Sequence, residues 1–596
     1  MMLTELTDAQ ADFVRHADGV CVEACPGAGK THAIVGRLAR LLTETGSRRG
    51  VAVLSFTNAA RDELLLRCRE SGLGDISKVP NYIGTVDSFI NQFVFSPLVR
   101  EELPESPRVV DSWDRMGVRI TPRGINLRGA VIGLDKFCPK KHTIPEAKLN
   151  QQIRSLFEAN QKTFELSARL RRNGLWKNGY FSASDARYIA RELLDKPKGK
   201  ALGAVLERRF LEVIIDEGQD SNPEDLKLFR WLQKNGVRVT FVCDPDQAIY
   251  AFRGVSVESI RTFQGEYSHA QQIRLTSNFR SSGAVCDLAA TLRSGRGADK
   301  AAGSYRDVTH PIGIVTYASA LDARVGEELR RQIDARGFQP EDAIVLSHGA
   351  KDGPLAFGRR HSRASVPTNN LGALAHAVSN FRATQQVSDA RMSAVRAIEG
   401  MLLELVGKGK HKEPLTQLKE MENASRVLRR QASQVLSSLS HGPEVSPTAW
   451  RARALETFGT LALALPKGKS LKTFLRQPPK DSWFELLTEG GGSEIRCSTV
   501  HHAKGREYDA VCVVLPSGKN TDELIDSWVS DIEGDSESLR VLYVAVTRAK
   551  QFVQLALPAK HADRVMTFLE DADLQVDRVD IGKSTVRKSR KKAGTE

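Results

Sequence analysis

Short apolar runs alternate with longer amphipathic segments along most of this 596-residue chain. A short apolar run bounded by turn residues is typical of a strand that is buried on both faces of a parallel sheet. The segments between the runs have apolar residues at helical spacing, as in Ala33, Ile34, Leu38 and Leu41. In the first half we expect strands at 20–24, 51–56, 82–85, 210–216, 237–243 and 272–276. This alternation predicts an α/β core built on a parallel sheet.

A second unit with the same alternation follows. We expect its strands at 312–317, 343–347, 495–499, 510–515 and 552–557. A segment with a helical pattern and many basic residues interrupts each unit. We therefore expect two α/β cores, each with one inserted, mainly helical subdomain. The expected boundaries are 1–96 and 201–272 for the first core, 97–200 for its insertion, 273–350 and 491–570 for the second core, 351–490 for its insertion, and 571–596 for a basic, disordered tail.

A glycine-rich loop joins the first apolar run to the first amphipathic segment. It is Ala24-Cys-Pro-Gly27-Ala28-Gly29-Lys30-Thr31. In such a loop the backbone N–H groups of Gly27, Ala28 and Gly29 face phosphate oxygens. Lys30 reaches the β- and γ-phosphate oxygens, and the Thr31 hydroxyl holds Mg²⁺. The first position of the pattern is alanine instead of glycine, but the flanking strand and helix patterns support the assignment. The segment predicts binding of a nucleoside triphosphate.

An acidic pair, Asp216 and Glu217, ends the apolar run that begins at Phe210. In parallel sheets the carboxyl ends of the strands carry the ligand chemistry. There Asp216 would complete the Mg²⁺ shell, and Glu217 would orient and deprotonate the attacking water. The alternative is that the acids only cap the helix expected from Pro223, a reading we consider far less favourable.

The formal net charge is +14, and six of the positive charges fall within 583–592. The remaining chain is mildly basic, which permits nucleic-acid binding without showing it. The eight cysteines are scattered, without the spacing of a metal site or a disulfide framework. No apolar run is long enough to span a bilayer, and the first residues lack the features of a secretory signal. We expect a cytoplasmic protein without a membrane partner.

Six further segments follow the phosphate-binding loop in order. They are Ser55-Phe56-Thr57-Asn58, Ile83-Gly-Thr85-Val-Asp87-Ser-Phe89, Val242 to Gly254, Leu275-Thr-Ser-Asn278-Phe279-Arg280-Ser, Thr499 to Tyr508, and Arg540 to Lys550. The ordered set resembles the superfamily 1 helicases of the UvrD/Rep/PcrA type. The resemblance covers both cores and leaves out the two insertions and the tail.

The resemblance implies two RecA-like motor cores that use ATP and Mg²⁺. Gln10 would contact the adenine edge, Phe279 would stack on adenine, and Glu507 would contact the ribose. Catalysis would involve Lys30 and Glu217 together with a set that converges on the γ-phosphate: Gln247, Arg280 and Arg548. Cationic groups around developing charge are also what phosphoryl transfer requires on physical grounds. The implied activity is that of an ATP-dependent translocase and helicase with 3′→5′ polarity.

The implied substrate is single-stranded DNA, or DNA with a single-stranded tail. The positions that would contact the strand are Phe56, Thr57, Thr85, Tyr250, Phe252, Arg253 and His501. Aromatic rings suit a motor that accepts any sequence, because every base offers a face for stacking. Taken singly, each aromatic is more often a core residue, but the sequence Tyr250-Ala-Phe252-Arg253 directly after Gln247 favours the platform.

Some positions depart from the resembling proteins, among them Asp87 in place of histidine, Cys243 in place of glycine, and Gly218 in place of a bulkier residue. Within the family, the segment from Asn81 to Phe89 and the compact insertions look most like the helicase subunit of the Gabija anti-phage system. Similar helicases accompany OLD-family nucleases. The alternative function is therefore a nucleic-acid-sensing ATPase subunit that controls such a nuclease. An inactive scaffold is disfavoured, because all the ATP-handling residues are present.

Overall fold

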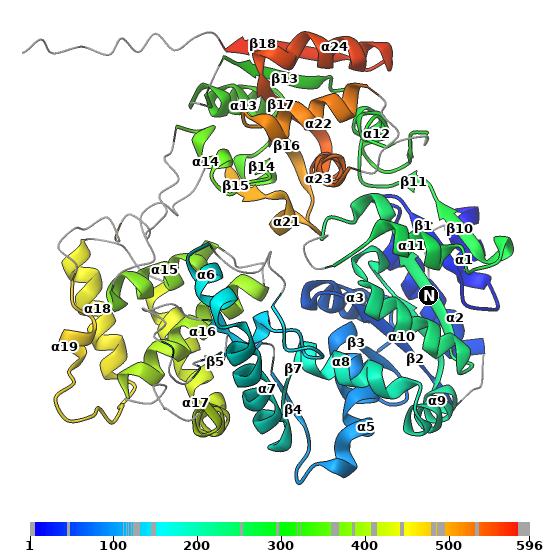
Figure 1. The fold of residues 1–596 in the computed structure, drawn as a ribbon. Helices are drawn as coiled ribbons and strands as arrows, with labels where there is room; N and C mark the ends of the chain where they lie inside the picture. The colour runs from blue at the N-terminus through cyan, green and yellow to red at the C-terminus, as the bar shows by residue number, and fades with distance from the viewer. Residues whose placement is uncertain are drawn as a thin grey trace, which may run out of the picture.

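The computed structural model shows two parallel-sheet cores and two inserted subdomains (Figure 1). It describes residues 6–44, 48–74, 76–110, 112–114, 116, 118–120, 122, 125, 132–144, 151–250, 254–293, 297–318, 320–321, 323–358, 369–383, 388–406, 414–440, 446–477, 484, 495–530 and 536–581. Among these, no helix combines the length and the apolar character needed to cross a bilayer.

The sheet of the first core has the strand order β10-β1-β9-β8-β2-β3, and its described pairs are all parallel. Its strands are β1 (Cys21–Ala24), β2 (Gly50–Ser55), β3 (Tyr82–Thr85), β8 (Phe210–Ile215), β9 (Arg238–Cys243) and β10 (Gln272–Leu275). Along β8, Val213 and Ile215 pack into one hydrophobic cluster, and Ile214 packs into another. Both faces of the sheet are therefore buried, which explains why its strands have continuous apolar runs.

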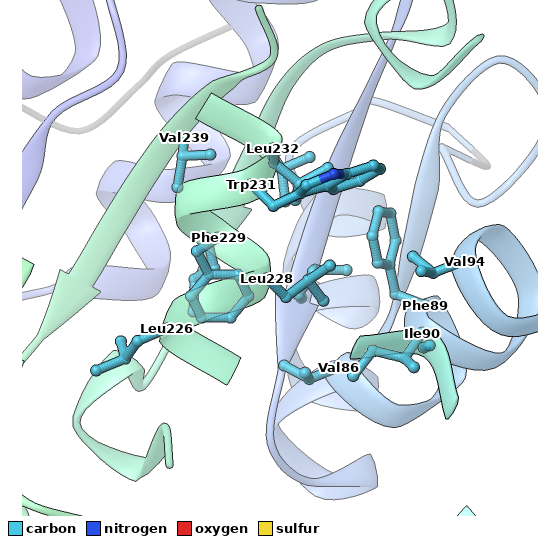
Figure 2. Packing of buried hydrophobic residues seen from close by; sticks show 14 of the residues in the cluster. Val86, Phe89, Ile90, Val94, Leu226, Leu228, Phe229, Trp231, Leu232 and Val239 are labelled. Atoms are coloured by element: carbon cyan, nitrogen blue, oxygen red, sulfur yellow. The ribbon is translucent and has the colours of Figure 1, made fainter. Parts of the chain in front are cut away.

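Helices cover this sheet and support the residues at its strand ends. They are α1 (Asp8–Arg15), α2 (Lys30–Glu44), α3 (Asn58–Glu70), α4 (Val86–Phe89), η1 (Ile90–Phe95), α5 (Ser96–Val99), η2 (Arg100–Glu102), α8 (Ala183–Leu194), α9 (Pro197–Arg209), η5 (Gly218–Asp220), α10 (Pro223–Lys234), η6 (Pro245–Gln247), α11 (Val257–Gln264) and η8 (His269–Gln271). Figure 2 shows Leu228 and Trp231 of α10 directed toward Phe89, and all three side chains are buried. This packing fixes the segment that follows β3.

The sheet of the second core has the order β15-β14-β16-β17-β13-β18, and its described pairs are also parallel. The strands of this core are β11 (Ser277–Asn278), β12 (Lys300–Ala301), β13 (Ile312–Tyr317), β14 (Ala343–Ser347), β15 (Arg496–Thr499), β16 (Tyr508–Val514), β17 (Ala549–Pro558) and β18 (Val576–Ile581). Its helices are α12 (Gly283–Ala290), α13 (Ala323–Ala335), η9 (Pro340–Asp342), α14 (Asp352–Leu355), α21 (Val500–Ala503), α22 (Lys519–Val529), α23 (Glu537–Val546), η10 (Ala559–His561) and α24 (Ala562–Asp571).

Several elements differ from the expected boundaries. α8 lies within 97–200, where we expected the insertion, but it packs into the hydrophobic cluster of the first core. β10 belongs to the first sheet, so the boundary expected after residue 272 cuts this strand. We propose to place it after Leu275. β18 lies within 571–596, where we expected only a basic tail. It is an edge strand with mostly half-buried residues. Its pattern is therefore more polar than that of the central strands and contains no continuous apolar run.

Each insertion has its own hydrophobic core. The first contains β4 (Arg108–Val110), β5 (Arg119–Ile120), β6 (Ile132–Gly133), η3 (Leu134–Lys136), α6 (Gln151–Ala159), α7 (Gln161–Lys177) and β7 (Tyr180–Ser182). The second contains α15 (Asn370–Ala383), α16 (Ser388–Leu405), α17 (Pro414–Ser440), α18 (Pro447–Gly459) and α19 (Leu471–Phe474). Both are mainly helical, as the sequence predicts. In Figure 1, α21 projects from the second core toward the first.

Candidate active site between the two cores

The phosphate-binding loop lies between β1 and the first turn of α2, which begins at Lys30. Gly27 (φ +73°) and Gly29 (φ +68°) adopt the left-handed conformation that favours glycine. A Cβ atom on Gly27 would lie 2.4 Å from Oδ1 of Asn278, so this glycine also allows the second core to approach the loop closely. The backbone is thus shaped as a cradle for an anion.

Lys30 and two carboxylates lie next to this cradle. Nζ of Lys30 is 3.8 Å from Oε1 of Glu217. Burial alone would lower the pKa of Lys30, but the nearby carboxylates, chiefly that of Glu217, raise it. Lys30 is therefore protonated at neutral pH and is placed to contact phosphate. Asp216 extends the sheet beyond β8, because its N–H donates to the Leu54 carbonyl oxygen (2.8 Å).

The two carboxylates have opposite ionisation behaviour. Burial and the neighbouring negative charge of Glu217 raise the pKa of Asp216 to about 7. Burial opposes ionisation of Glu217 as well, but Lys30 and Lys504 outweigh it and lower the pKa of Glu217 to about 2. Glu217 is thus an anion that can accept a hydrogen bond from water. The carboxyl of Asp216 and the hydroxyl of Thr31 offer the hard oxygen ligands that suit Mg²⁺.

A cavity of about 220 Å³ opens beside the loop and is lined by Thr7, Asp8, Ala9, Gln10, Ala28, Leu275, Thr276 and Ser277. Oε1 of Gln10 accepts from the N–H of Thr7 (3.0 Å), and its Nε2 donates to the Ala28 carbonyl oxygen (2.9 Å). The amide of Gln10 is therefore oriented against the loop. The N–H of Phe279 donates to the Gly27 carbonyl oxygen (2.9 Å), and its side chain is 39% exposed. A Cβ atom on Gly29 would lie 2.9 Å from Nε2 of Gln10 and 4.0 Å from a ring carbon of Phe279, so both side chains lie beside the loop.

Side chains of the second core complete the site from the opposite side. Nη2 of Arg548 donates to Oε1 of Gln247 (2.9 Å), and both residues are buried. Burial and the positive charge of Arg280 lower the pKa of Arg548 to about 10, which keeps it protonated at neutral pH. Nη1 of Arg280 donates to the Thr547 carbonyl oxygen (3.2 Å), and its Nη2 pairs with Glu507 (2.5 Å). The structure thus brings together the residues expected at the γ-phosphate and the ribose.

Among the described residues expected to contact DNA, Phe56, Thr57 and Thr85 lie at or near the ends of β2 and β3, and Tyr250 and His501 lie beside each other. The ring centroids of Tyr250 and His501 are 6.0 Å apart, and Nε2 of His501 is 3.1 Å from the Ile249 carbonyl oxygen. Thr57 and Thr85 are N-caps of α3 and α4, which places both side chains at helix N-termini. Phe56 packs partly buried against the main cluster of the first core. Phe252 and Arg253 lie outside the described residues.

Two domain comparisons match this architecture. Residues 6–268 match the UvrD/REP helicase N-terminal domain, and residues 494–556 match the UvrD-like helicase C-terminal domain. The two matches together cover just over half of the chain and fall on its two cores. The chain belongs to the UvrD-like helicase superfamily. Its two-core fold and the order of its motifs are those expected from this membership.

Individual UvrD-like relatives are distant. DNA helicase II of Salmonella typhimurium is 28% identical over 49% of this chain and 40% of its own length. DNA helicase II of Escherichia coli is 27% identical over 67% of this chain and 55% of its own. The ATP-dependent DNA helicase PcrA of Staphylococcus aureus is 23% identical over 58% and 48%, respectively. The chain thus spans about half the length of these relatives.

The structure adds two residues that the sequence analysis did not single out. Nζ of Lys504, in the second core, pairs with Oδ1 of Asp220 in the first (2.6 Å) and donates to the Gln247 carbonyl oxygen (3.2 Å). It also lies 4.7 Å from the centroid of the Tyr250 ring. Lys504 therefore contacts both the segment that carries Gln247 and a candidate strand platform. The feature of the sequence that could have identified these two residues is that Lys504 and Asp220 each lie within a recognised motif.

Two of the departures from other UvrD-like proteins have a structural explanation. Asp87 forms an ion pair with Arg187 of α8, which also pairs with Asp225 of α10, so three helices are joined here. A Cβ atom on Gly218 would lie 2.5 Å from the ring of Phe241. The bulkier residue expected at this position would therefore displace that ring.

Proposed function

We propose that this chain is an ATP-dependent single-stranded DNA translocase and helicase. The observation that carries the proposal is the hydrogen bond from Arg548 of the second core to Gln247 of the first, next to the Lys30–Glu217 pair. Phosphoryl transfer is catalysed mainly by positioning and by cations around developing charge. Here those cations come from both cores, so catalysis depends on how the cores are placed relative to each other.

Each residue then has a defined task. Lys30 and the N–H groups of the loop bind the phosphates, and the anionic Glu217 orients the attacking water. Thr31 and Asp216 would hold Mg²⁺, which when bound supplies positive charge at the phosphate oxygens. Arg280 and Arg548 stabilise the charge that develops on the transferred phosphoryl group. Gln10 and Phe279 hold the base at the outer edge of the loop.

The link from ATP to the strand passes through short covalent and polar connections. Gln247 and Tyr250 are three residues apart, and Lys504 contacts both of their segments. A change in the contact between Arg548 and Gln247 is therefore transmitted to the ring of Tyr250. Repeated opening and closing of the cores would move such platforms along the DNA strand. The 3′→5′ polarity of this movement rests on the resemblance alone.

The test combines two variants with a matched control. Lys30→Ala should abolish ATP turnover because it removes the phosphate-binding cation. Glu217→Gln should retain ATP binding and lower turnover at least tenfold. The control, Lys198→Ala, removes an exposed lysine on α9 and should leave ATP binding and ATP turnover unchanged.

Turnover is measured with and without single-stranded DNA, and unwinding with duplexes that carry a 3′ or a 5′ tail. Unwinding of only the 5′-tailed duplex would contradict the polarity. Wild-type turnover that does not respond to DNA would contradict the proposed function.

A second assignment, to a Gabija-type anti-phage complex with an OLD-family nuclease, rests only on the sequence resemblance. The insertions are the surfaces of this chain that are not used by the proposed motor, so we place the partner there. Purification of the tagged chain from its host at mild salt should then retain a nuclease. Recovery of the chain without a nuclease would contradict this second assignment and leave the proposal of a helicase that acts alone.

A further inference from the structure

A row of buried polar side chains runs from Gln247 into the second core. Nε2 of Gln247 donates to Oδ2 of Asp244 (2.8 Å), and the N–H of Asp244 donates to Oε1 of Gln219 (2.9 Å). The side chain of Asp244 is 2% exposed. Because Arg548 holds the other end of the Gln247 amide, the position of Asp244 decides the orientation of the whole amide group.

Tyr543 approaches the same carboxylate oxygen from the second core. Its hydroxyl lies 3.5 Å from Oδ2 of Asp244, and its side chain is fully buried. Burial raises the pKa of Tyr543 well above its usual range, so the hydroxyl stays a donor. Tyr543 lies in the last turn of α23, and Arg548 follows two residues after the helix ends, where its Nε donates to the Val544 carbonyl oxygen (3.1 Å). The end of α23 and the residues after it therefore present two side chains to the short segment from Asp244 to Gln247.

Arg293 lies over the ring of Tyr543. Its guanidinium lies 5.3 Å from the ring centroid and forms an ion pair with Asp299 (3.1 Å). Both side chains of that pair are less than 10% exposed. Nη2 of Arg293 also donates to the Gly297 carbonyl oxygen (3.2 Å). The ring of Tyr543 is thus held within the second core, and its hydroxyl moves with that core.

We propose that Tyr543 is a positioning residue that reports closure of the two cores to Gln247 through Asp244. The inference rests on the proposed function. A separation of 3.5 Å is longer than an ordinary O–H···O hydrogen bond of about 2.7–2.8 Å. Because the two groups belong to different cores, a small movement of α23 makes or breaks the bond. When it is made, Asp244 and Gln247 are held in one orientation, and Gln247 is ready to act at the phosphate.

The test is Tyr543→Phe, which keeps the ring and removes only the hydroxyl. We expect kcat of the DNA-stimulated ATPase to fall about tenfold, as for loss of one hydrogen bond to a charged acceptor. KM for ATP should stay within about twofold, because the loop and the base contacts are untouched. In an Asp244→Asn background, Tyr543→Phe should cause no further loss, since both changes act on one pathway.

The control is Tyr317→Phe, which removes a buried hydroxyl bonded to the Leu515 carbonyl oxygen within the second core (2.6 Å). It should lower the melting temperature and leave kcat and KM for ATP unchanged at a temperature where the variant is folded. An unchanged kcat in Tyr543→Phe would overturn the proposal. So would additive losses with Asp244→Asn, or a fall in melting temperature that accounts for the whole loss of kcat. If wild-type turnover does not respond to DNA, the proposed function fails instead, and the two failures are thus distinguishable.

Discussion

At the scale of single residues, the pair after β8 places two carboxylates side by side in a buried site. Asp216 and Glu217 are adjacent, and the N–H of Glu217 donates to Oδ1 of Asp216 (3.0 Å). Glu217 also has a positive φ of 55°, an uncommon conformation for a residue with a side chain. Strain and like charge at one point are typical of sites where function opposes stability.

Asp216→Asn should stabilise the protein without Mg²⁺ or nucleotide. The folded pKa of about 7 lies above the ordinary value of 3.8, so the folded state holds a proton that the unfolded state has lost between these pH values. Stability therefore falls as pH rises through that window. At pH 8 the variant should have a higher melting temperature than the wild type. The gain in the free energy of unfolding should be at most about 4 kcal/mol and should vanish near pH 4.

Glu217→Gln is the matched opposite in the same melting experiment. The pKa of Glu217 is lowered from 4.5 to about 2, so its charge contributes stability above about pH 4.5 and loses it as pH falls toward 2. This variant should melt at a lower temperature than the wild type at pH 8. Equal shifts of the same sign in both variants would contradict the assigned roles.

At the scale of elements, a buried ion pair holds α1 against α2 and β8. Arg37 of α2 contacts both carboxylate oxygens of Glu212 (2.7 and 2.9 Å), and both side chains are fully buried. Arg37 also donates to the carbonyl oxygens of Phe13 and Asp18 (2.7 Å each). The helix that carries Gln10 is therefore fixed to the helix that begins at Lys30. The sequence pattern predicted the helix that follows the phosphate-binding loop but not this brace.

Glu212→Gln should lower the free energy of unfolding by about 3–5 kcal/mol, because it leaves the guanidinium of Arg37 buried without its counter-charge. Chemical denaturation measures the loss. Glu266→Gln is the control, since it breaks an ion pair with Arg230 whose side chains are 30% and 39% exposed. That change should remove less than about 1 kcal/mol. Similar losses in the two variants would argue against a brace.

At the scale of the whole molecule, the two cores are linked by polar contacts between motifs and by the buried side chain of Ile249, which packs into the hydrophobic cluster of the second core. Lys504 contacts Asp220, Arg548 contacts Gln247, and Nε of Arg540 donates to the Ala248 carbonyl oxygen (2.8 Å). Such contacts can break and re-form when the cores move, whereas a large apolar interface would hold them rigidly. The arrangement suits a protein whose cycle is a change in core placement.

Lys504→Met should lower DNA-stimulated ATP turnover about tenfold or more while the cores remain folded. The reason is that the inter-core ion pair with Asp220 and the contact with the Tyr250 ring are lost together. Steady-state turnover against DNA concentration measures the effect, with circular dichroism as the test of folding. Lys560→Met, which breaks an ion pair with Asp522 inside the second core, is the control and should keep wild-type turnover. Full stimulation in Lys504→Met would remove Lys504 from the coupling path.

The amino-acid sequence by itself determined the two parallel-sheet cores, because strands buried on both faces must be apolar throughout, as Val213 to Ile215 are. It also determined the phosphate-binding loop, because Gly27 and Gly29 are required locally by their backbone conformation. Only the tertiary structure decided which residues meet across the cores. Arg548 and Gln247 are 301 positions apart, and Lys504 and Asp220 are 284 apart. No local pattern records such pairs, because packing of the complete cores, and not chain propensity, brings them together.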